Sequence, residues 1–152
     1  MRTYQKQIEG ISKVLEDSFL VLVSVLNEIF TQEIPNGATK IVLWVPLGTD
    51  YNLHFSYMNN EGSEVEIRDG LSVLDPVLYR LLDHAYDELP GQEHEFGRDI
   101  DIIFAKWLNK GLDTSKFKNT KLHKVMAINN VCAYIDLSTL KVLKDSEMWS
   151  QP

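Results

Sequence analysis

The sequence contains a single cysteine, Cys132, among 152 residues. One cysteine cannot form an intramolecular disulfide or supply a cysteine-based zinc site, so neither is expected to support the fold. The apolar segment around Cys132 predicts a small core residue, and nothing near it indicates a nucleophile. This cysteine usage fits a reducing compartment, and we expect a cytoplasmic protein.

Long apolar runs are also missing. The longest lies in residues 19–26, is interrupted by Ser24, and is far shorter than the roughly 20 residues that span a bilayer. Glu9 and Glu16 precede it where a secretory signal would carry basic residues, and no small-residue cleavage site follows. We therefore expect neither a membrane span nor a signal peptide.

No catalytic, nucleotide-binding or metal-binding motif is present in the sequence. The four histidines lie on different expected elements, and no pair has the spacing of two ligands on one helix face or in one hairpin: His54, His84, His94 and His123. Glu93-His94-Glu95 resembles part of a metal-binding tract, but it lacks a second histidine, and we expect a solvated loop between helices. We expect no metal and no cofactor.

The chain does contain enough apolar sequence for one core. Its composition, 44% hydrophobic and 24% charged, is typical of a globular protein and argues against disorder. No repeat, low-complexity tract or long linker divides it. We expect one domain that spans residues 1–152.

Residues 3–33 have the periodicity of an amphipathic helix that ends at Pro35-Asn36-Gly37. Its apolar positions recur at steps of three and four: Ile8, Ile11, Leu15, Phe19, Leu22, Leu26 and Ile29. Further apolar residues surround the middle of this helix on its other sides: Leu20, Val21, Val23 and Val25. Such a helix is either buried inside the fold or shared with a second copy. We favour burial, with a homodimer through this helix, acting as an adaptor, as the alternative.

Strand patterns follow the helix. Residues 40–46 form a nearly continuous β-branched and aromatic run, typical of a central strand. Residues 51–58 and 64–68 alternate apolar and polar side chains on the two sides of a turn. This alternation predicts an antiparallel hairpin with one core face and one solvated face.

The solvated face of this hairpin carries polar side chains that suggest an alternative function. Pairing across the turn is expected to bring His54 near Arg68 and Ser56 near Glu66. Such residues are ordinary on a solvated sheet face, and no strained nucleophile turn accompanies them. A small hydrolase or transferase with its site around His54 is the alternative reading.

Two helices are expected next, at residues 75–89 and 97–110. Asp75-Pro76 is a typical helix start, and Gly111 falls just past the expected end of the second helix. Short strands are expected at residues 123–128, 131–136 and 140–143. The predicted fold is therefore an α+β domain. In it, a long N-terminal helix packs on an antiparallel sheet, and a helix pair is inserted before the C-terminal strands.

Charge is distributed unevenly along the chain, whose net charge is −7. Residues 71–101 carry eight acidic and two basic side chains, whereas residues 102–152 carry eight lysines and four acids. Lysines in the segment 106–124 would suit phosphate contacts, but the negative net charge and the lack of a recognition helix or aromatic platform argue against nucleic-acid binding.

The acidic segment combines carboxylates with tyrosines. Carboxylates speed the encounter with a cationic partner, and tyrosine offers a large, rigid contact surface. Helix dipoles and solubility explain such charges without a partner, and we leave that alternative open. We predict a partner-binding surface formed by Tyr79, Asp83, Tyr86, Asp87, Glu88, Glu93, Glu95, Asp99 and Asp101.

The order of these features resembles a known family. A long N-terminal helix, a three-stranded meander, an acidic helical stretch and C-terminal strands in a small acidic chain are similar to immunity proteins of bacterial polymorphic-toxin and contact-dependent growth inhibition systems. The resemblance implies a non-enzymatic inhibitor that binds one toxin domain, often a basic nuclease, and blocks its active site in the cytoplasm of the producing cell.

Overall fold

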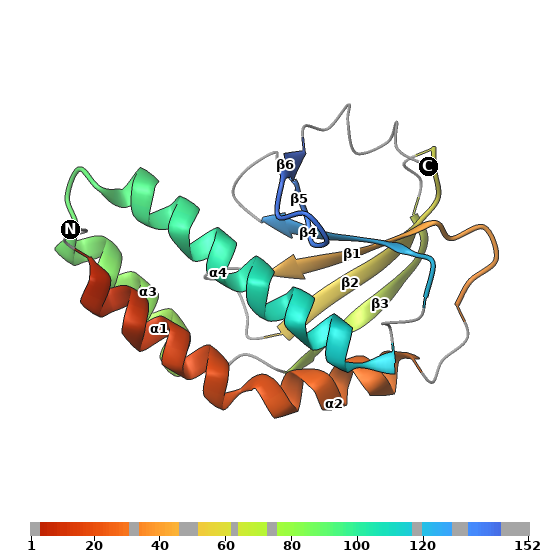
Figure 1. Cartoon of the computed structure of the whole chain (residues 1–152), viewed down its shortest axis with the longest axis horizontal. Helices are drawn as coiled ribbons and strands as arrows, with labels where there is room; N and C mark the ends of the chain where they lie inside the picture. The colour runs from red at the N-terminus through yellow and green to blue at the C-terminus, as the bar shows by residue number, and fades with distance from the viewer. Residues whose placement is uncertain are drawn as a thin grey trace.

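The computed structural model describes residues 4–30, 34–45, 52–61, 64–72, 76–116, 120–128 and 134–143. Within them the first elements are α1 (Gln5–Asp17), α2 (Phe19–Phe30), β1 (Lys40–Val45), β2 (Asn52–Met58) and β3 (Glu64–Ser72). The remaining elements are α3 (Pro76–Glu88), α4 (Glu93–Thr114), β4 (His123–Ile128), β5 (Tyr134–Asp136) and β6 (Val142–Leu143). The expected α+β class is confirmed (Figure 1).

The strands form one sheet in the order β3-β2-β1-β4-β5-β6. Every neighbouring pair is antiparallel except β1 and β4, which run parallel in the centre. The prediction of an antiparallel sheet was therefore wrong, because two antiparallel meanders are joined by one parallel pair. A parallel pair requires a long crossover, and the segment between β1 and β4 provides one that includes α3 and α4.

The predicted single N-terminal helix is in fact two helices, α1 and α2, which meet at Ser18 (Figure 1). Ser18 has φ −93° and ψ 0°, and its amide donates to the carbonyls of Val14 and Leu15. The Leu15 carbonyl also accepts a hydrogen bond of 2.7 Å from Trp107 Nε1. A side chain that takes a helix carbonyl out of the regular ladder is a known cause of a bend. We call the junction at Ser18 the elbow.

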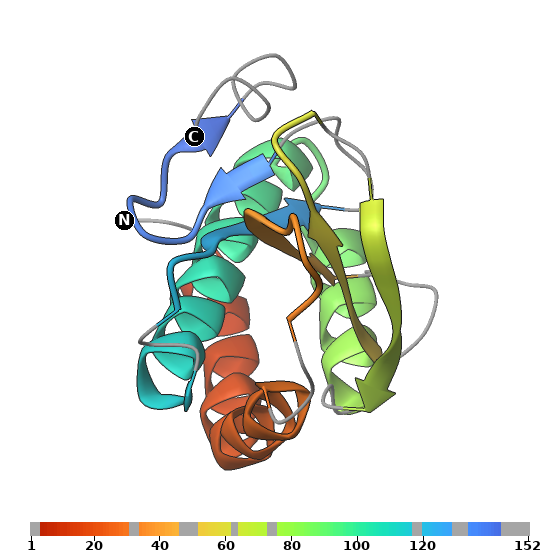
Figure 2. The ribbon, with the colours of Figure 1, turned by 90° about the vertical axis from the view of Figure 1, so that its right-hand side faces the viewer.

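The helices lie together on one side of the sheet (Figure 2). Both α1 and α2 pack on other helices, α1 against α3 and α4, and α2 against α4. The contact between α2 and α4 is close at Gly111, which lies inside α4 and not past its end as predicted. A methyl group on Gly111 would lie 2.5 Å from Leu22 Cδ2, so the absence of a side chain permits this approach.

Apolar side chains fill both faces of the central strands. On the helix side, Ile41, Leu43 and Phe55 join the main core with the buried positions of all four helices. On the other side, Val42 and Val125 are buried in a second apolar cluster. Burial on both faces explains why the β1 sequence is continuously apolar. The structure does not describe the side chains of residues 51–53 and 62–75, so the predicted core face of the hairpin is seen only in part.

Candidate functional site

The predicted acidic residues lie on the hairpin formed by α3 and α4. The exposed carboxylates on these helices, which we call the acidic surface, are Asp83, Asp87, Glu88, Glu93 and Glu95. The two helices are connected by a tight turn in which Gly91 adopts a φ of +82°. This hairpin, together with α1, projects past the end of the sheet (Figure 1).

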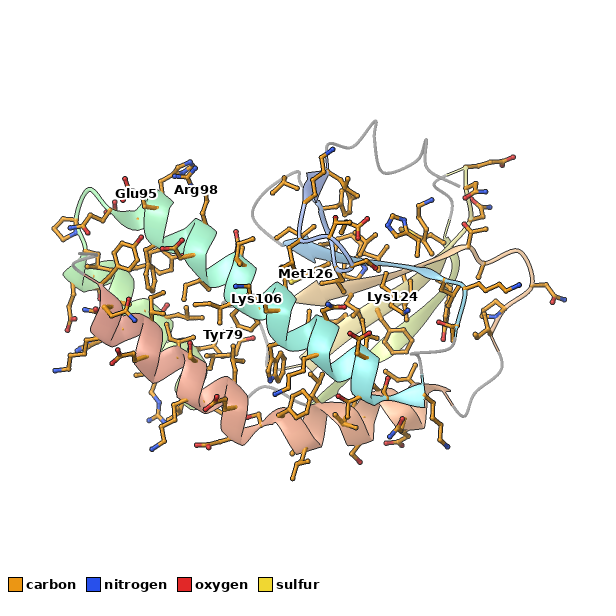
Figure 3. All side chains as sticks on the ribbon, viewed as in Figure 1. Tyr79, Glu95, Arg98, Lys106, Lys124 and Met126 are labelled. Carbon is orange, nitrogen blue, oxygen red and sulfur yellow. The ribbon has the colours of Figure 1, made fainter. Side chains whose placement is uncertain are left out.

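The Glu93-His94-Glu95 segment begins α4 and is not the solvated loop that we predicted. Gln92 occupies the N-cap position without a side-chain hydrogen bond to the helix. Carboxylates in the first turn of a helix interact favourably with its unpaired amides and its dipole, which accounts for helix formation from Glu93 onwards. Glu95 and Arg98 lie near this end of α4, whereas Lys106 lies further along the helix (Figure 3).

Two of the predicted site residues, Asp99 and Asp101, are half-buried. Tyr4 donates its hydroxyl to Asp99 Oδ2 over 2.6 Å, and this bond ties the start of α1 to α4. Burial raises the pKa of Asp101 to about 6. Within the described part of the chain, Asp101 has no hydrogen bond or ion pair that would stabilise its charge. Asp99 therefore has a structural role, and Asp101 is an unstabilised carboxylate.

The two predicted tyrosine anchors differ in their surroundings. Tyr79 is only 8% exposed and belongs to the core, so it is not available as a surface anchor. Tyr86 is half-buried and packs edge-on against Phe96, with 5.2 Å between ring centroids. Burial raises the pKa of the Tyr86 hydroxyl, and the negative charge of Asp101 raises it further.

Leu81 on α3 is 37% exposed, although apolar residues of this helix surround it in the sequence. The buried positions of this helix, Leu78, Leu82 and Ala85, recur at steps of four and three, and Leu81 lies one position off this stripe. The sequence pattern alone does not separate Leu81 from this stripe, because Leu81 lies three positions after Leu78 and four before Ala85. Leu81 is the exposed apolar residue on the same helix as Asp83 and Asp87.

Glu88 makes the most contacts among the acidic surface residues. Gln7 Nε2 donates to Glu88 Oε2 over 2.9 Å, and His84 Nε2 lies 3.4 Å from Glu88 Oε1. All these groups are exposed or half-exposed, so the contacts are weak and compete with water. Glu88 therefore contributes to the contact between α1 and α3 as well as to the surface charge.

The alternative site around His54 does not have the geometry that we predicted. The β2–β3 register is irregular between Leu53 and Phe55 and places Ser56 opposite Ile67. The predicted pairings of His54 with Arg68 and of Ser56 with Glu66 are therefore wrong. Ser56 is 3% exposed and accepts a hydrogen bond of 3.2 Å from Trp44 Nε1, so its hydroxyl is held inside the structure.

A cluster of titratable residues that the sequence analysis missed lies on the same sheet face. His123 Nε2 lies 2.7 Å from Asp136 Oδ2, and Asp136 Oδ1 accepts the amides of Ser138 and Thr139. Burial by itself raises the pKa of Asp136, but the hydrogen bonds from His123 and the two amides lower it below its ordinary value. His123 and Asp136 lie on β4 and β5, which pair antiparallel, so the strands expected at residues 123–128 and 131–136 already contained this signal.

Lys40 lies beside His123 in the β1–β4 register and is 0% exposed. Its Nζ atom lies 3.4 Å from Asn60 Oδ1, and burial lowers the pKa of its ammonium group. In the described part of the chain, His123 Nδ1 is also buried and has no hydrogen-bond partner. Neither ring nitrogen of His123 is therefore available to solvent, because Nε2 contacts Asp136 and Nδ1 is buried.

The remaining predicted features have mixed outcomes. Trp107 is buried, whereas Lys106, Lys110 and Lys121, from the lysine-bearing segment 106–124, are exposed on the surface. Cys132, and Lys118 of the segment 106–124, lie outside the described residues. Within the described ranges, no group of three or more histidine, cysteine or acidic side chains could hold a metal ion. The helices of these ranges are also too short or too polar to cross a membrane.

Comparison with protein-family models, with curated proteins and with solved structures finds no match to this chain.

Proposed function

We propose that this protein is a non-enzymatic inhibitor that binds a basic protein partner, such as a bacterial toxin domain, through the acidic surface on α3 and α4. The observation that carries the proposal is the exposure of all five carboxylates of that surface on one helical hairpin: Asp83, Asp87, Glu88, Glu93 and Glu95. A concentration of one sign of charge speeds the encounter with a partner of the opposite sign.

Exposed carboxylates alone give a fast encounter and little affinity, so the surface also requires contacts that exclude water. Leu81 offers exposed apolar area on α3, on the helix face that it shares with Glu88 two turns later, and Tyr86 offers the edge of a ring that Phe96 holds in place. Tyr79 is no longer part of the proposed surface because it is buried. Asp99 is engaged with Tyr4, so its removal would also loosen α1.

The position of the surface suits an inhibitor. The helical hairpin projects past the sheet, so a partner can approach it without meeting the strands (Figure 1). Helices held by a core also present their side chains with little loss of conformational entropy on binding. The resemblance in element order to immunity proteins supports the same reading and suggests a toxin domain as the partner.

The test begins with isolation of the partner. The tagged chain is incubated with native extract, and a basic protein should be retained in a one-to-one ratio. The Asp83→Lys/Asp87→Lys variant should retain much less of it. The matched control reverses two exposed carboxylates outside the acidic surface, Glu61 and Asp113, and should retain the partner normally.

The inhibitory role is tested with the purified partner. Its enzymatic or toxic activity should fall to zero as the wild-type chain is titrated to one equivalent. Retention of no stoichiometric partner, or equal retention by both charge-reversal variants, would count against the proposed surface. Binding without loss of the partner's activity would leave the interface in place but contradict inhibition.

A further inference from the structure

Apolar side chains are exposed at the elbow between α1 and α2. Leu20 is 80% exposed and Val21 is 49% exposed, although we predicted that this helix would be buried inside the fold. Both residues follow the bend at Ser18, and the inner positions Leu22 and Leu26 are fully buried against the core. Exposure of a leucine and a valine side by side on the most apolar helix of the chain is typical of an interaction surface.

A groove lies between the elbow and α4, and Phe19, the residue before Leu20, is part of its lining. Its volume is about 460 Å³, within the range of sites that accept an apolar group. Leu15, Phe19, Ile103 and Trp107 give it apolar walls. Trp107 is held in place by its hydrogen bond to the Leu15 carbonyl, so the floor of the groove is preformed.

The rim of the groove is charged on both sides. Lys106 and Lys110 lie on the α4 side, and Lys110 Nζ stands 4.8 Å above the centre of the Phe19 ring. Glu16 lies on the elbow side, and Asp17 follows it on the surface. The elbow therefore combines a protruding apolar residue, an apolar groove, two carboxylates and two ammonium groups in one patch.

A two-fold interface is formed by the same patch on both copies, so that patch must be complementary to itself. The elbow meets this condition, because it carries both a protruding side chain and a groove, and both signs of charge. We propose that the elbow is the interface of a homodimer. In it, Leu20 of each copy enters the groove of the other, and Glu16 and Asp17 of each copy face Lys106 and Lys110 of the other. The proposal does not depend on the proposed function. If the acidic surface of one copy bound the elbow of another, the two patches would differ and the copies would form an open, head-to-tail chain. The elbow carries as many carboxylates as ammonium groups, so it can pair with the elbow of a second copy instead.

The acidic surface remains accessible in such a dimer. Glu95 and Lys106 are separated by eleven positions on α4, which corresponds to roughly 17 Å along the helix axis. The part of the acidic surface on α4 therefore lies well away from the groove on the same helix (Figure 3), and the rest of that surface lies on α3. The dimer would present two acidic surfaces, one from each copy.

The first experiment measures the mass of the full chain in solution by light scattering, coupled to size-exclusion chromatography over a range of concentrations. The wild type should reach twice the 17.5 kDa of one chain. Leu20→Asp should remain folded by circular dichroism, because Leu20 is exposed, and should raise the dimer dissociation constant by roughly a hundredfold. The matched control is Val142→Asp, which changes an exposed valine on β6 and should leave the dimer intact.

The second experiment tests the charge pairing. Lys106→Glu/Lys110→Glu should weaken the dimer, and adding Glu16→Lys/Asp17→Lys to the same chain should restore it, because all four pairs are then reversed together. Lys13→Glu/Lys121→Glu reverses two exposed lysines outside the groove and should not weaken the dimer. A wild type that stays monomeric at every concentration, a dimer that survives Leu20→Asp, or a reversed set that fails to restore the dimer would each overturn the proposal.

Discussion

At the scale of single residues, Asp101 is a half-buried carboxylate on α4 beside Tyr86. Burial raises its pKa from 3.8 to about 6 in the folded protein. The folded state therefore binds a proton more tightly than the unfolded state, and the stability of the protein falls as the pH rises between these two values. The loss of stability caused by the buried charge of Asp101 reaches its full size at pH values above about 6.

This linkage predicts the effect of Asp101→Asn, which replaces the carboxyl by a neutral group of the same shape. The variant should match the wild type near pH 4 and become the more stable protein as the pH rises through about 6. Melting temperatures of both proteins across this range test the prediction. The exposed Asp113 serves as the control, because Asp113→Asn should leave the pH dependence of the wild type in place. A difference between Asp101→Asn and wild type that does not change with pH would contradict it.

Two glycines in helices predict opposite effects of the same substitution. Gly111→Ala adds a methyl group 2.5 Å from Leu22 Cδ2 in the packed contact between α4 and α2. The overpacking outweighs the gain in helix propensity, and we expect a net loss of about 1 kcal/mol. Gly10→Ala on α1 meets nothing within 4 Å and should stabilise the protein by up to about 1 kcal/mol.

Equilibrium urea unfolding of the two alanine variants measures both effects. The pair separates helix propensity from packing, because each variant makes the same chemical change in a helix interior. Equal stabilisation by both substitutions would mean that Leu22 moves aside at no cost, and that the approach of α2 to α4 does not depend on Gly111.

At the scale of elements, the elbow depends on one hydrogen bond between α4 and the first helix pair. Trp107→Phe keeps most of the ring but removes the Nε1 donor that binds the Leu15 carbonyl over 2.7 Å. Loss of a buried donor from its carbonyl partner should lower the free energy of unfolding by about 1 to 3 kcal/mol. Trp44→Phe is the matched control, because its indole binds the Ser56 hydroxyl, which can rotate to another partner.

Both tryptophan variants are compared by urea unfolding, and far-ultraviolet circular dichroism reports any change of helix content. An effect of Trp107→Phe no larger than that of Trp44→Phe would show that the elbow is set by the local sequence around Ser18. In that case, the low helix propensity of Asp17 and Ser18 would explain the bend.

The elements themselves were largely predictable from the sequence, because the period of apolar residues reports local structure. β4 was predicted with its observed bounds, and α3 was predicted to within one residue at each end. The start of α4 at Glu93, four residues before the expected one, was missed because Gln92 is not a typical N-cap residue. Gly111 was misread because a glycine that ends a helix and one that permits close packing look the same in a sequence.

The contacts between distant elements were not predictable in this way. The pairing of β1 with β4 brings Lys40 beside His123, although 82 positions separate them in the chain. The acidic residues of the candidate site were recognised from their composition, but the burial of Tyr79 and the exposure of Leu81 depend on how α3 packs. The spacing of apolar residues located the buried face of α3, but which residues at the boundary of that face are buried depends on the packing of the helix.

At the scale of the whole molecule, charge is separated along the helical layer. The acidic surface lies on α3 and the first turn of α4, and Lys106 and Lys110 lie in the second half of α4. A basic partner should therefore be drawn to one end of the molecule. Charge reversal at Asp83 and Asp87 should slow association steeply at low salt and less at high salt, since salt screens exposed charges.

Stopped-flow measurements with the isolated partner at several salt concentrations test this prediction. Leu81→Ala should instead speed dissociation, because contacts that exclude water determine the lifetime of a complex. The Glu61→Lys/Asp113→Lys variant provides a control with the same change of net charge. If association were insensitive to the Asp83/Asp87 reversal, these carboxylates would serve solubility alone.

The parallel pair at the centre of the sheet has a consequence for how the chain is made. A nascent chain emerges with its N-terminus first, so β1 can pair with β2 and β3 before residues 123–128 exist to cover its other edge. An uncovered strand edge accepts strands from neighbouring chains. Until residues 123–128 have been synthesised, the growing polypeptide therefore leaves open the edge of β1 that β4 later covers, and this edge is exposed to other chains throughout synthesis of α3 and α4.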